Sequence, residues 1–466
     1  MPPLSQNHIM KTAIILFRND FRLEDQAALY AASLQADHLI PLYIHDDKQS
    51  DNPGLASLSY LHYSLKSLQQ DLQDGYQNPL IIRRGTLQEE LQKIIEQSQA
   101  DALYFGNCLD GLYSASDSQI MSLSCEVYMY NTRYLIESHQ LSTQKGDSFK
   151  VFTPYYKSFL KTIQVRPQWP KPKTLPRPNK PLSSLKIEEL QLLPQIPWDK
   201  NFYQKTIPGE KAAQDNWSIF LQKRLNKYSH ERNFPTLEAT SKLSTALHFG
   251  EISPVQIYHH SQKSTAKEEA SQFRRQVIWR DFAHYCLVHY PQMRRQEFHD
   301  KFAQFPWEND HQKFHAWSKG QTGYPIIDAA MRELWQTGIM HNRCRMIVAS
   351  FLVKDLLIDW RWGMKHFEET LIDADIANNV FAWQWAAGCG LDAAPYYRIF
   401  NPWTQSAKFD KEAEYIKKWI PELSHLPAKN LHSTKLMQES LIVNYPPPIL
   451  SHDQARIKAL EIYKTL

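Results

Sequence analysis

The sequence predicts two parts: an α/β domain built on a five-stranded, parallel, doubly wound sheet, and then a large all-helical domain. The first third predicts the sheet, because five short apolar runs rich in β-branched residues alternate there with helical segments. From about residue 210, apolar residues recur every three or four positions, which predicts helices and few strands. A chain of 466 residues is also too long for one ordinary core, so two or three domains are expected.

The expected strands follow one another along the first third. They span residues 12–17, 38–44, 80–84, 102–105 and 125–130. Segment 57–73 places Leu61, Leu65, Leu68 and Leu72 at helical spacing, which predicts a crossover helix. No G-x-G-x-x-G motif follows the first strand, where FRNDFRLED stands instead, so the usual dinucleotide-binding fingerprint is missing.

A proline-rich stretch predicts the connection between the domains. Eight prolines lie from Pro167 to Pro197, a density that blocks regular helix and favours extended backbone. We therefore expect an α/β domain over 10–140, a connector over 141–209 and an all-helical domain over 210–466.

Composition predicts an ordinary globular protein. Hydrophobic residues make up 42% of the chain and charged residues 22%, and the mean hydropathy is -0.52, which argues against disorder and membrane embedding. The five cysteines are scattered without a C-x-x-C pair, which predicts reduced thiols rather than disulfides or a zinc site. The sequence shows no long apolar run and no signal-peptide pattern, so we expect a cytoplasmic protein without membrane contact.

The charges are unevenly distributed. Residues 1–164 carry 13 Lys and Arg against 18 Asp and Glu, whereas the remaining residues carry 40 against 31. The net charges are therefore -5 and +9, which makes the helical half the candidate for binding a polyanion. A mildly basic helical domain without such a partner would show the same balance.

Tryptophan is confined to the later part of the chain. All 13 tryptophans lie at or beyond Trp169, and ten of them lie from Trp279 onward. Large helical domains use tryptophan to fill their cores. Indoles also stack on nucleobases or a flavin, and closely spaced indoles can relay single electrons. Composition does not separate these uses.

The helical half contains a long and specific sequence signature. It consists of TGYPIIDAAMRELWQTGIMHNRCRMIVASFLVKDLLIDWRWG and, after a short interval, LIDADIANNVFAWQWAAGCGLDAAPYYRIFNPWTQSAKFD. Supporting segments are FRNDFRLED, ATSKLSTALHFGEIS and VIWRDF. These motifs resemble the photolyase/cryptochrome family along essentially the whole chain, most closely the class I microbial cyclobutane pyrimidine dimer photolyases. The resemblance implies a light-driven DNA repair enzyme that binds FAD in its helical domain.

The resemblance assigns one group of residues to FAD. The phosphates are expected at Tyr228, Thr240, Ser241, Lys242, Leu243, Ser244 and Arg280, and the ring and ribose at Arg345, Asp373, Ala374, Asp375 and Asn379. Hydroxyls, backbone N–H groups and an ammonium at a helix start suit a pyrophosphate, although such segments also cap helices. Asn379 is expected to face flavin N5, where plant photoreceptors of the family carry Asp, and this favours repair over signalling. Its neighbour Asn378 is the alternative, but the spacing to Trp383 favours Asn379.

Three tryptophans match the electron-transfer triad of the family, which leads from the flavin to the surface. They are Trp383, Trp360 and Trp307. The implied role is photoreduction of oxidised FAD by an electron that moves inward along the triad. Packing without electron transfer is the alternative reading of all three.

A second group of residues matches the family's pocket for a flipped-out lesion. It comprises Gln276, Trp279, Asn342, Arg343, Met346 and Trp385, with Arg232 and Arg398 as phosphate contacts. Gln276 stands where dimer photolyases carry Glu. An amide can hydrogen-bond a pyrimidine, but unlike a carboxylic acid it donates no acidic proton. Six-four photolyases also carry Gln there, but they use two histidines where this chain has Asn342 and Met346. Gln276 and Asn379 are therefore the expected catalytic residues of a dimer-splitting enzyme.

The first domain is expected to hold an antenna chromophore, with 5,10-methenyltetrahydrofolate as the first choice and a deazaflavin as the second. Segment 107–117 is degenerate against the family pattern, and Asp110 is the candidate for the position of a pterin-binding Glu. The expected reaction is electron donation from reduced, light-excited FAD to a pyrimidine dimer, which splits into monomers. The expected partner is UV-damaged DNA, bound by a monomer. Alternatives are a cryptochrome-type blue-light receptor, a six-four photolyase and a flavin-free nucleic-acid-binding protein.

Overall fold

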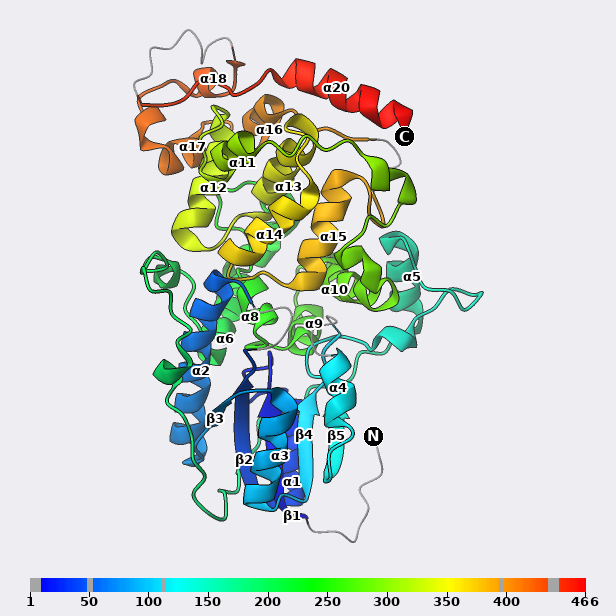
Figure 1. Cartoon of the computed structure of the whole chain (residues 1–466), viewed down its shortest axis with the longest axis vertical. Helices are drawn as coiled ribbons and strands as arrows, with labels where there is room; N and C mark the ends of the chain where they lie inside the picture. The colour runs from blue at the N-terminus through cyan, green and yellow to red at the C-terminus, as the bar shows by residue number, and fades with distance from the viewer. Residues whose placement is uncertain (1–9, 48–52, 110–113, 394–396, 435–443) are drawn as a thin grey trace.

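The computed structural model describes residues 10–47, 53–109, 114–393, 397–434 and 444–466. They form a part that carries a sheet at one end of the molecule and a helical part that makes up the rest (Figure 1). This arrangement confirms the predicted fold class. Among the described residues, no helix combines the length and the apolar character that a membrane crossing requires.

The sheet has five strands, and every neighbouring pair is parallel. The strands are β1 (Met10–Phe17), β2 (Ala36–His45), β3 (Ile81–Arg84), β4 (Ala102–Gly106) and β5 (Glu126–Tyr130), in the spatial order β3-β2-β1-β4-β5. The connecting helices are α1 (Ala27–Gln35), α2 (Leu55–Tyr76), α3 (Leu87–Ser98) and α4 (Ser114–Ile120). Each strand begins within two residues of its predicted start, and α2 contains the predicted crossover helix.

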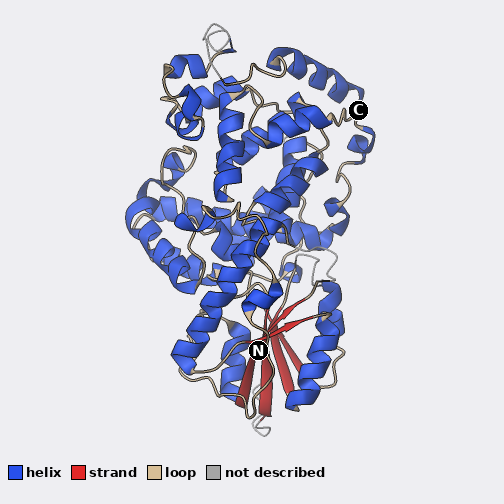
Figure 2. Ribbon diagram, turned by 60° about the vertical axis from the view of Figure 1, so that its left-hand side comes forward, coloured by secondary structure: helices blue, strands red, loops and turns tan. Residues whose placement is uncertain are grey.

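Alternate residues of β1 pack on opposite faces of the sheet, as the pleat requires. Ile15 and Phe17 lie in a core cluster with residues of α1 and α2, whereas Ile14 and Leu16 lie in a second cluster with residues of α3. Helices therefore cover both faces of the sheet (Figure 2). Burial on both faces explains why the strands are continuous apolar runs in the sequence.

The helical part follows the sheet in the chain. Its longer helices are α6 (Glu210–Ile219), α9 (Pro254–Gln262), α10 (Lys267–His289), α11 (His311–Ser318), α12 (Pro325–Thr337), α13 (Asn342–Ser350), α14 (Trp360–Thr370), α15 (Ile376–Ala387), α16 (Pro402–Phe409) and α20 (His452–Thr465). Shorter helices are α7 (Tyr228–Glu231), α8 (Ser244–His248), α17 (Glu414–Trp419) and α18 (Ala428–Leu431). A turn of π-helix, Phe351–Asp355, follows α13. Helix α20 lies at the end of the molecule far from the sheet (Figure 1).

The predicted connector contains one α-helix, α5 (Phe152–Thr162), which packs against α10. Residues 163–186 contain no helix or strand, as their proline content predicts. The Ser184 hydroxyl accepts from the N–H of Ile82 at 2.9 Å, and the N–H of Leu185 donates to the Ile82 carbonyl at 3.0 Å. Ile82 belongs to β3, an outer strand, so the connector lies along the edge of the sheet. The domain boundaries stay a prediction.

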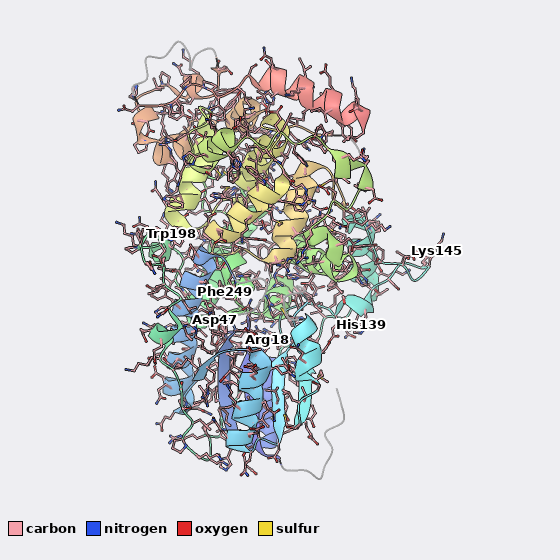
Figure 3. All side chains as sticks on the ribbon, viewed as in Figure 1. Arg18, Asp47, His139, Lys145, Trp198 and Phe249 are labelled. Atoms are coloured by element: carbon pink, nitrogen blue, oxygen red, sulfur yellow. The ribbon has the colours of Figure 1, made fainter. Side chains whose placement is uncertain are left out.

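Two of the sequence motifs meet where the sheet joins the helices. The N–H of Phe21 donates to the Phe249 carbonyl at 3.1 Å, and the buried Arg22 donates from Nη1 to the Gly250 carbonyl at 2.9 Å. Gly250 has a φ of 65°, and a Cβ atom there would lie 2.2 Å from the carbonyl oxygen of Asn19. Only glycine allows this approach. Figure 3 shows Phe249 at the junction between the sheet and the helices above it.

A buried carboxylate, Glu251, completes this junction. It accepts hydrogen bonds from the hydroxyls of Tyr60 at 2.8 Å and Ser64 at 2.7 Å, both on α2, and from the N–H of Gly209 at 2.8 Å. Burial raises the pKa of Glu251 to about 7 in spite of these donors. The two parts are thus joined through an acid that ionises near neutral pH.

We expect the junction to weaken as the pH rises. The pKa of Glu251 is higher in the folded chain than its ordinary value of 4.5, so its contribution to the free energy of unfolding falls by about 3 kcal/mol from about pH 4.5 to pH 7 and stays constant above. The Glu251→Gln variant lacks this titration. The urea midpoint of the wild type, followed by circular dichroism, should therefore fall relative to that of the variant over this range. A pH-independent difference between the midpoints would contradict this expectation.

Candidate functional site

Three helices, α10, α13 and α15, carry ten of the predicted site residues. Helix α10 packs against α7, α9 and α15, and α15 packs against α13 and α14 (Figure 1). Gln276, Trp279 and Arg280 lie on α10, residues 342–346 on α13, and residues 379–385 on α15. The site is therefore built on packed helices rather than on loops alone.

A buried ion pair lies just before α15. Nη2 of Arg345 donates to both carboxylate oxygens of Asp373, at 2.9 and 2.8 Å, and Nε of Arg345 donates to the Met340 carbonyl at 2.8 Å. The Asp373 side chain is only 2% exposed. A carboxylate at this depth needs a charged partner, and Arg345 on α13 supplies it. Half-buried Ala374 follows directly in the chain.

The next carboxylate, Asp375, caps the start of α15. Its Oδ1 accepts from the N–H of Asn378 at 2.9 Å and from the Asn378 side chain at 2.7 Å, and its Oδ2 lies 3.0 Å from Nε2 of His284. Burial alone would raise the pKa of Asp375, but the neighbouring His284 and Arg280 lower it well below its ordinary value. Asn378 is thus engaged with the cap, whereas the buried Asn379 donates its amide to the Met364 carbonyl at 3.1 Å.

The expected phosphate-binding residues lie around the start of α8. Tyr228 and Leu243 are buried, Thr240 and Ser241 are half-buried, and Ser244 is exposed. Lys242 has a φ of 56°, and its ammonium lies 2.9 Å from a carboxylate oxygen of Glu238. The buried Arg280 donates to the carbonyls of Arg133 at 2.9 Å and Leu247 at 3.3 Å, so it ties α10 to the end of α8.

The chemistry of these groups fits FAD. Lys242, Arg280 and the hydroxyls near α8 offer positive charge and donors for a pyrophosphate. The ionised Asp375 offers an acceptor for hydroxyl or ring N–H groups, and Asn379 offers a neutral amide beside it. The pair Arg345 and Asp373 would place a fixed dipole next to the ring.

The predicted electron-transfer triad runs from the core toward the surface. Trp383 and Trp360 are 2% and 0% exposed and belong to one core cluster, and the half-buried Trp307 packs against that cluster. A Cβ atom added to Gly363 would lie 2.1 Å from Cη2 of Trp383, so α14 and α15 meet at this indole. Trp317 lies in the same cluster, with its ring 6.2 Å from that of Trp383. Of the three, only Trp307 reaches the surface, which is the position that the last carrier of an electron chain requires.

The predicted lesion pocket has two sides. On the α10 side, Nη2 of Arg232 donates to Oε1 of Gln276 at 2.9 Å, and Trp279 stacks on Phe152 with ring centroids 3.7 Å apart. On the other side, Met346, Trp385 and Arg398 line one pocket, together with Ser350, Lys354, Ala386, Gly388, Tyr397, Phe400 and Tyr463. Asn342 and Arg343 lie against the Met346 sulfur. The geometry thus joins Arg232 to Gln276, and it brings four further predicted residues, Asn342, Arg343, Trp385 and Arg398, together around Met346.

Positive charge concentrates around this pocket. Burial lowers the pKa of Arg343, and the positive charges of Arg232 and Arg398 lower it further. Arg343 donates to the Asn233 side chain at 2.8 Å, but none of the three arginines forms an ion pair with a residue that the structure describes. Three cations that repel one another without a carboxylate favour an anionic partner.

Several contacts of the site were not predicted from the sequence. His284 holds Asp375, Phe152 stacks on Trp279, and burial lowers the pKa of the pocket residue Lys354 to about 7. His284 lies four residues after Arg280 on one face of α10, and this spacing was a usable signal. Asp110, the predicted antenna residue, lies outside the described residues.

The fold and the chemistry of the site together fit a protein that binds FAD among the helices of its larger part. Residues 13–177 match a family model described as "DNA photolyase", and residues 273–465 match one described as "FAD binding domain of DNA photolyase". The deoxyribodipyrimidine photo-lyase of Agrobacterium fabrum is 38% identical, with 97% of this chain and 98% of that protein covered. The chain belongs to the photolyase/cryptochrome family.

Solved structures agree with this assignment. A bacterial class III photolyase from Agrobacterium tumefaciens superposes with a TM-score of 0.93 at 36% identity, covering 99% of both chains. The cryptochrome of Synechocystis sp. PCC6803 superposes with a TM-score of 0.86 at 30% identity, covering 98% of this chain and 99% of that one. The family, the enzyme class and the FAD-binding helical domain predicted from the sequence are confirmed. The class I affiliation and the individual site residues stay predictions.

Proposed function

We propose that this protein repairs UV-damaged DNA by splitting cyclobutane pyrimidine dimers in a light-driven reaction. The observation that carries the proposal is the group of Arg232, Arg343 and Arg398, which form no ion pair with a described residue, at and near a pocket lined by Trp385, Met346 and Arg398. Cations of this kind bind DNA phosphates, and an aromatic wall accepts a base that has left the helix. FAD, when bound and reduced, supplies the electron after absorbing blue or near-ultraviolet light.

Each group of residues has its own part in this proposal. The arginines hold the DNA backbone, and Trp279 and Trp385 pack against the flipped pyrimidines. Gln276, oriented by Arg232, offers its amide to a pyrimidine. Asn379 holds a neutral amide beside the flavin, where it hydrogen-bonds the ring without supplying an acid. The tryptophan triad would conduct electrons from an external donor toward the bound, oxidised cofactor under light.

The decisive test is light-dependent recovery of thymine monomers from irradiated oligothymidine. The flavin-loaded, chemically reduced protein should release monomers under blue light and none in the dark. Flavin absorption without any repair would favour the blue-light receptor, which the similarity to a cryptochrome keeps as the rival. Repair of six-four photoproducts but not of dimers would also overturn the proposal.

The Gln276→Glu variant should split dimers with a quantum yield equal to or higher than that of the wild type. A carboxylate at this position would pair with Arg232, which already donates to the amide oxygen at 2.9 Å, and would accept from a pyrimidine N–H. An isosteric substitution in this position should leave folding intact. A lower splitting yield at saturating DNA would show that the amide, not a carboxylate, suits this pocket.

The antenna belongs to the proposal as well. We place 5,10-methenyltetrahydrofolate first and a deazaflavin second in the sheet domain, with Asp110 as the candidate contact. The absorption spectrum of the native protein between the flavin bands distinguishes the two, and a spectrum of FAD alone would contradict both. A cytoplasmic location and a monomeric state complete the proposal, and gel filtration with and without DNA tests the second.

A further inference from the structure

The half-buried indole of Trp279 is stacked on one face by another ring. Phe152, only 1% exposed, lies against it with ring centroids 3.7 Å apart and planes inclined by 14°. Phe282 and Phe381 contact the same indole edge-on, at 5.7 and 5.9 Å. Trp279 is therefore fixed by three rings, and among the described residues no ring stacks on its other face, which is the face that could meet a nucleobase.

The guanidinium of Arg275 lies against the aromatic rings of α5 that adjoin Trp279. Cζ of Arg275 lies 5.4 Å from the ring centroid of Phe152 and 5.2 Å from that of Tyr156, both on α5. Arg275 precedes Trp279 by four residues, so the two side chains lie on the same face of α10. Cation–π contact with two rings holds the guanidinium in place before any ligand arrives.

The donors of Arg275 are not used within the described part of the chain. Its guanidinium is half-buried and forms no hydrogen bond or ion pair with a described residue. Arg275 and Asp392 interact only through space. The charge of Arg275 lowers the pKa of Asp392, whereas burial has the larger effect and raises it. Asp392 Oδ1 instead accepts from the N–H of Phe152 at 3.3 Å. An arginine that is held by its face and free at its edge is suited to grip a phosphate.

We propose that Arg275 binds a backbone phosphate of the damaged strand beside the lesion, on the α5 side of the pocket. The inference rests on the proposed function, because it takes the other face of Trp279 as a wall of the lesion pocket. Phe152 and Tyr156 position the guanidinium, and the same Phe152 ring positions the indole. The Phe152 ring thus positions both Trp279, which contacts the base, and Arg275, which contacts the phosphate. Arg232, Arg343 and Arg398 supply the phosphate contacts on the other sides.

The neighbouring Arg274 offers a matched control. It has the same charge and a similar half-buried environment, but its Cζ lies 6.0 Å from the ring of Tyr258 on α9, away from Phe152 and Trp279. The variants to compare are Arg275→Gln, Arg274→Gln and Arg275→Lys. Both neutral variants change the net charge of the protein by the same amount, so a general charge effect would act on them equally.

The test measures the affinity of the flavin-loaded protein for a duplex with one thymine dimer, by fluorescence anisotropy in the dark from 50 to 200 mM salt. Losing one phosphate contact should make the slope of log K against log salt shallower by about 0.9 and weaken binding about 5- to 10-fold. We expect this for Arg275→Gln but not for Arg274→Gln. Arg275→Lys should restore the slope, since it keeps the charge.

Equal behaviour of Arg275→Gln and Arg274→Gln, with either no loss or the same loss, would overturn the inference. A lower melting temperature of Arg275→Gln alone, with an unchanged salt slope, would also overturn it, because the arginine would then act only in packing. Trp279→Ala separates this outcome from a failure of the proposed function. If Trp279→Ala leaves dimer affinity intact, the lesion pocket itself is misplaced. If it abolishes that affinity while Arg275→Gln does not change it, only the phosphate contact is wrong.

Discussion

Replacing Trp383 with Phe should stop light-driven reduction of the flavin while leaving dimer splitting by chemically reduced protein unchanged. Phenylalanine fills most of the buried space beside Gly363 but is much harder to oxidise than an indole. We expect the photoreduction rate to fall by at least about 100-fold, equivalent to about 2.7 kcal/mol of barrier. The measurement is the bleaching of oxidised flavin absorption under blue light with an external electron donor.

Trp317 provides the control for this experiment. It is as buried as Trp383, lies 6.2 Å from it in the same core cluster, and donates from Nε1 to the Val348 carbonyl at 3.1 Å. Trp317→Phe makes a similar change in volume outside the predicted triad. It should slow photoreduction little. If both variants reduce at the wild-type rate, or both fail alike, Trp383 does not carry the electron.

The second large effect is expected at the buried ion pair before α15. Arg345→Gln removes the only cation that contacts Asp373 among the described residues. A buried carboxylate left without its partner typically destabilises a protein by about 3 to 5 kcal/mol. If the flavin binds beside this pair, its affinity should fall by about 100-fold or more. The flavin-to-protein absorbance ratio after dialysis measures that loss.

The double variant Arg345→Gln with Asp373→Asn distinguishes a structural effect from a cofactor effect. It removes both charges, so most of the stability lost in Arg345→Gln should return. Flavin retention should not return with it, because the fixed charges beside the ring are absent. Recovery of both stability and flavin content would show that the pair serves folding alone. The half-buried pair of Arg332 and Glu422, 2.6 Å apart, provides a comparison outside the predicted site.

The sheet could be predicted because its signals are local. Ile14 and Ile15 point to opposite faces, and both faces are buried, so the strand is a continuous apolar run of the right length. The break between α13 and α14 could not be predicted in this way. Residues 342–360 have an unbroken helical pattern, yet a π-turn ends α13, Leu357 adopts a φ of 52°, and Asp359 caps α14. Leucine favours no such backbone, so tertiary packing must impose it.

The site shows the same division between local and distant signals. The order of charged residues around Asp373 and Asp375 is visible in one short segment, and the resemblance to a family assigned their roles. Phe152 was missed because its partner Trp279 lies far along the chain, on another helix, and no spacing rule connects them. The same is true of Lys354, whose ammonium donates to the Arg398 carbonyl and so joins a π-turn to a loop. Chain segments that meet only after folding leave no periodicity in the sequence.

The hydrogen bonds of Ser184 and Leu185 to Ile82 have a consequence for how the molecule behaves at high concentration. Each of the two edge strands of a sheet carries a row of unpaired backbone N–H and C=O groups, and such a row can pair with a strand of another molecule. The connector already occupies part of the row on β3, with its prolines unable to extend the ladder. Clipping the chain near residue 180 with a protease should therefore expose this row and promote aggregation, even though the flavin region is untouched.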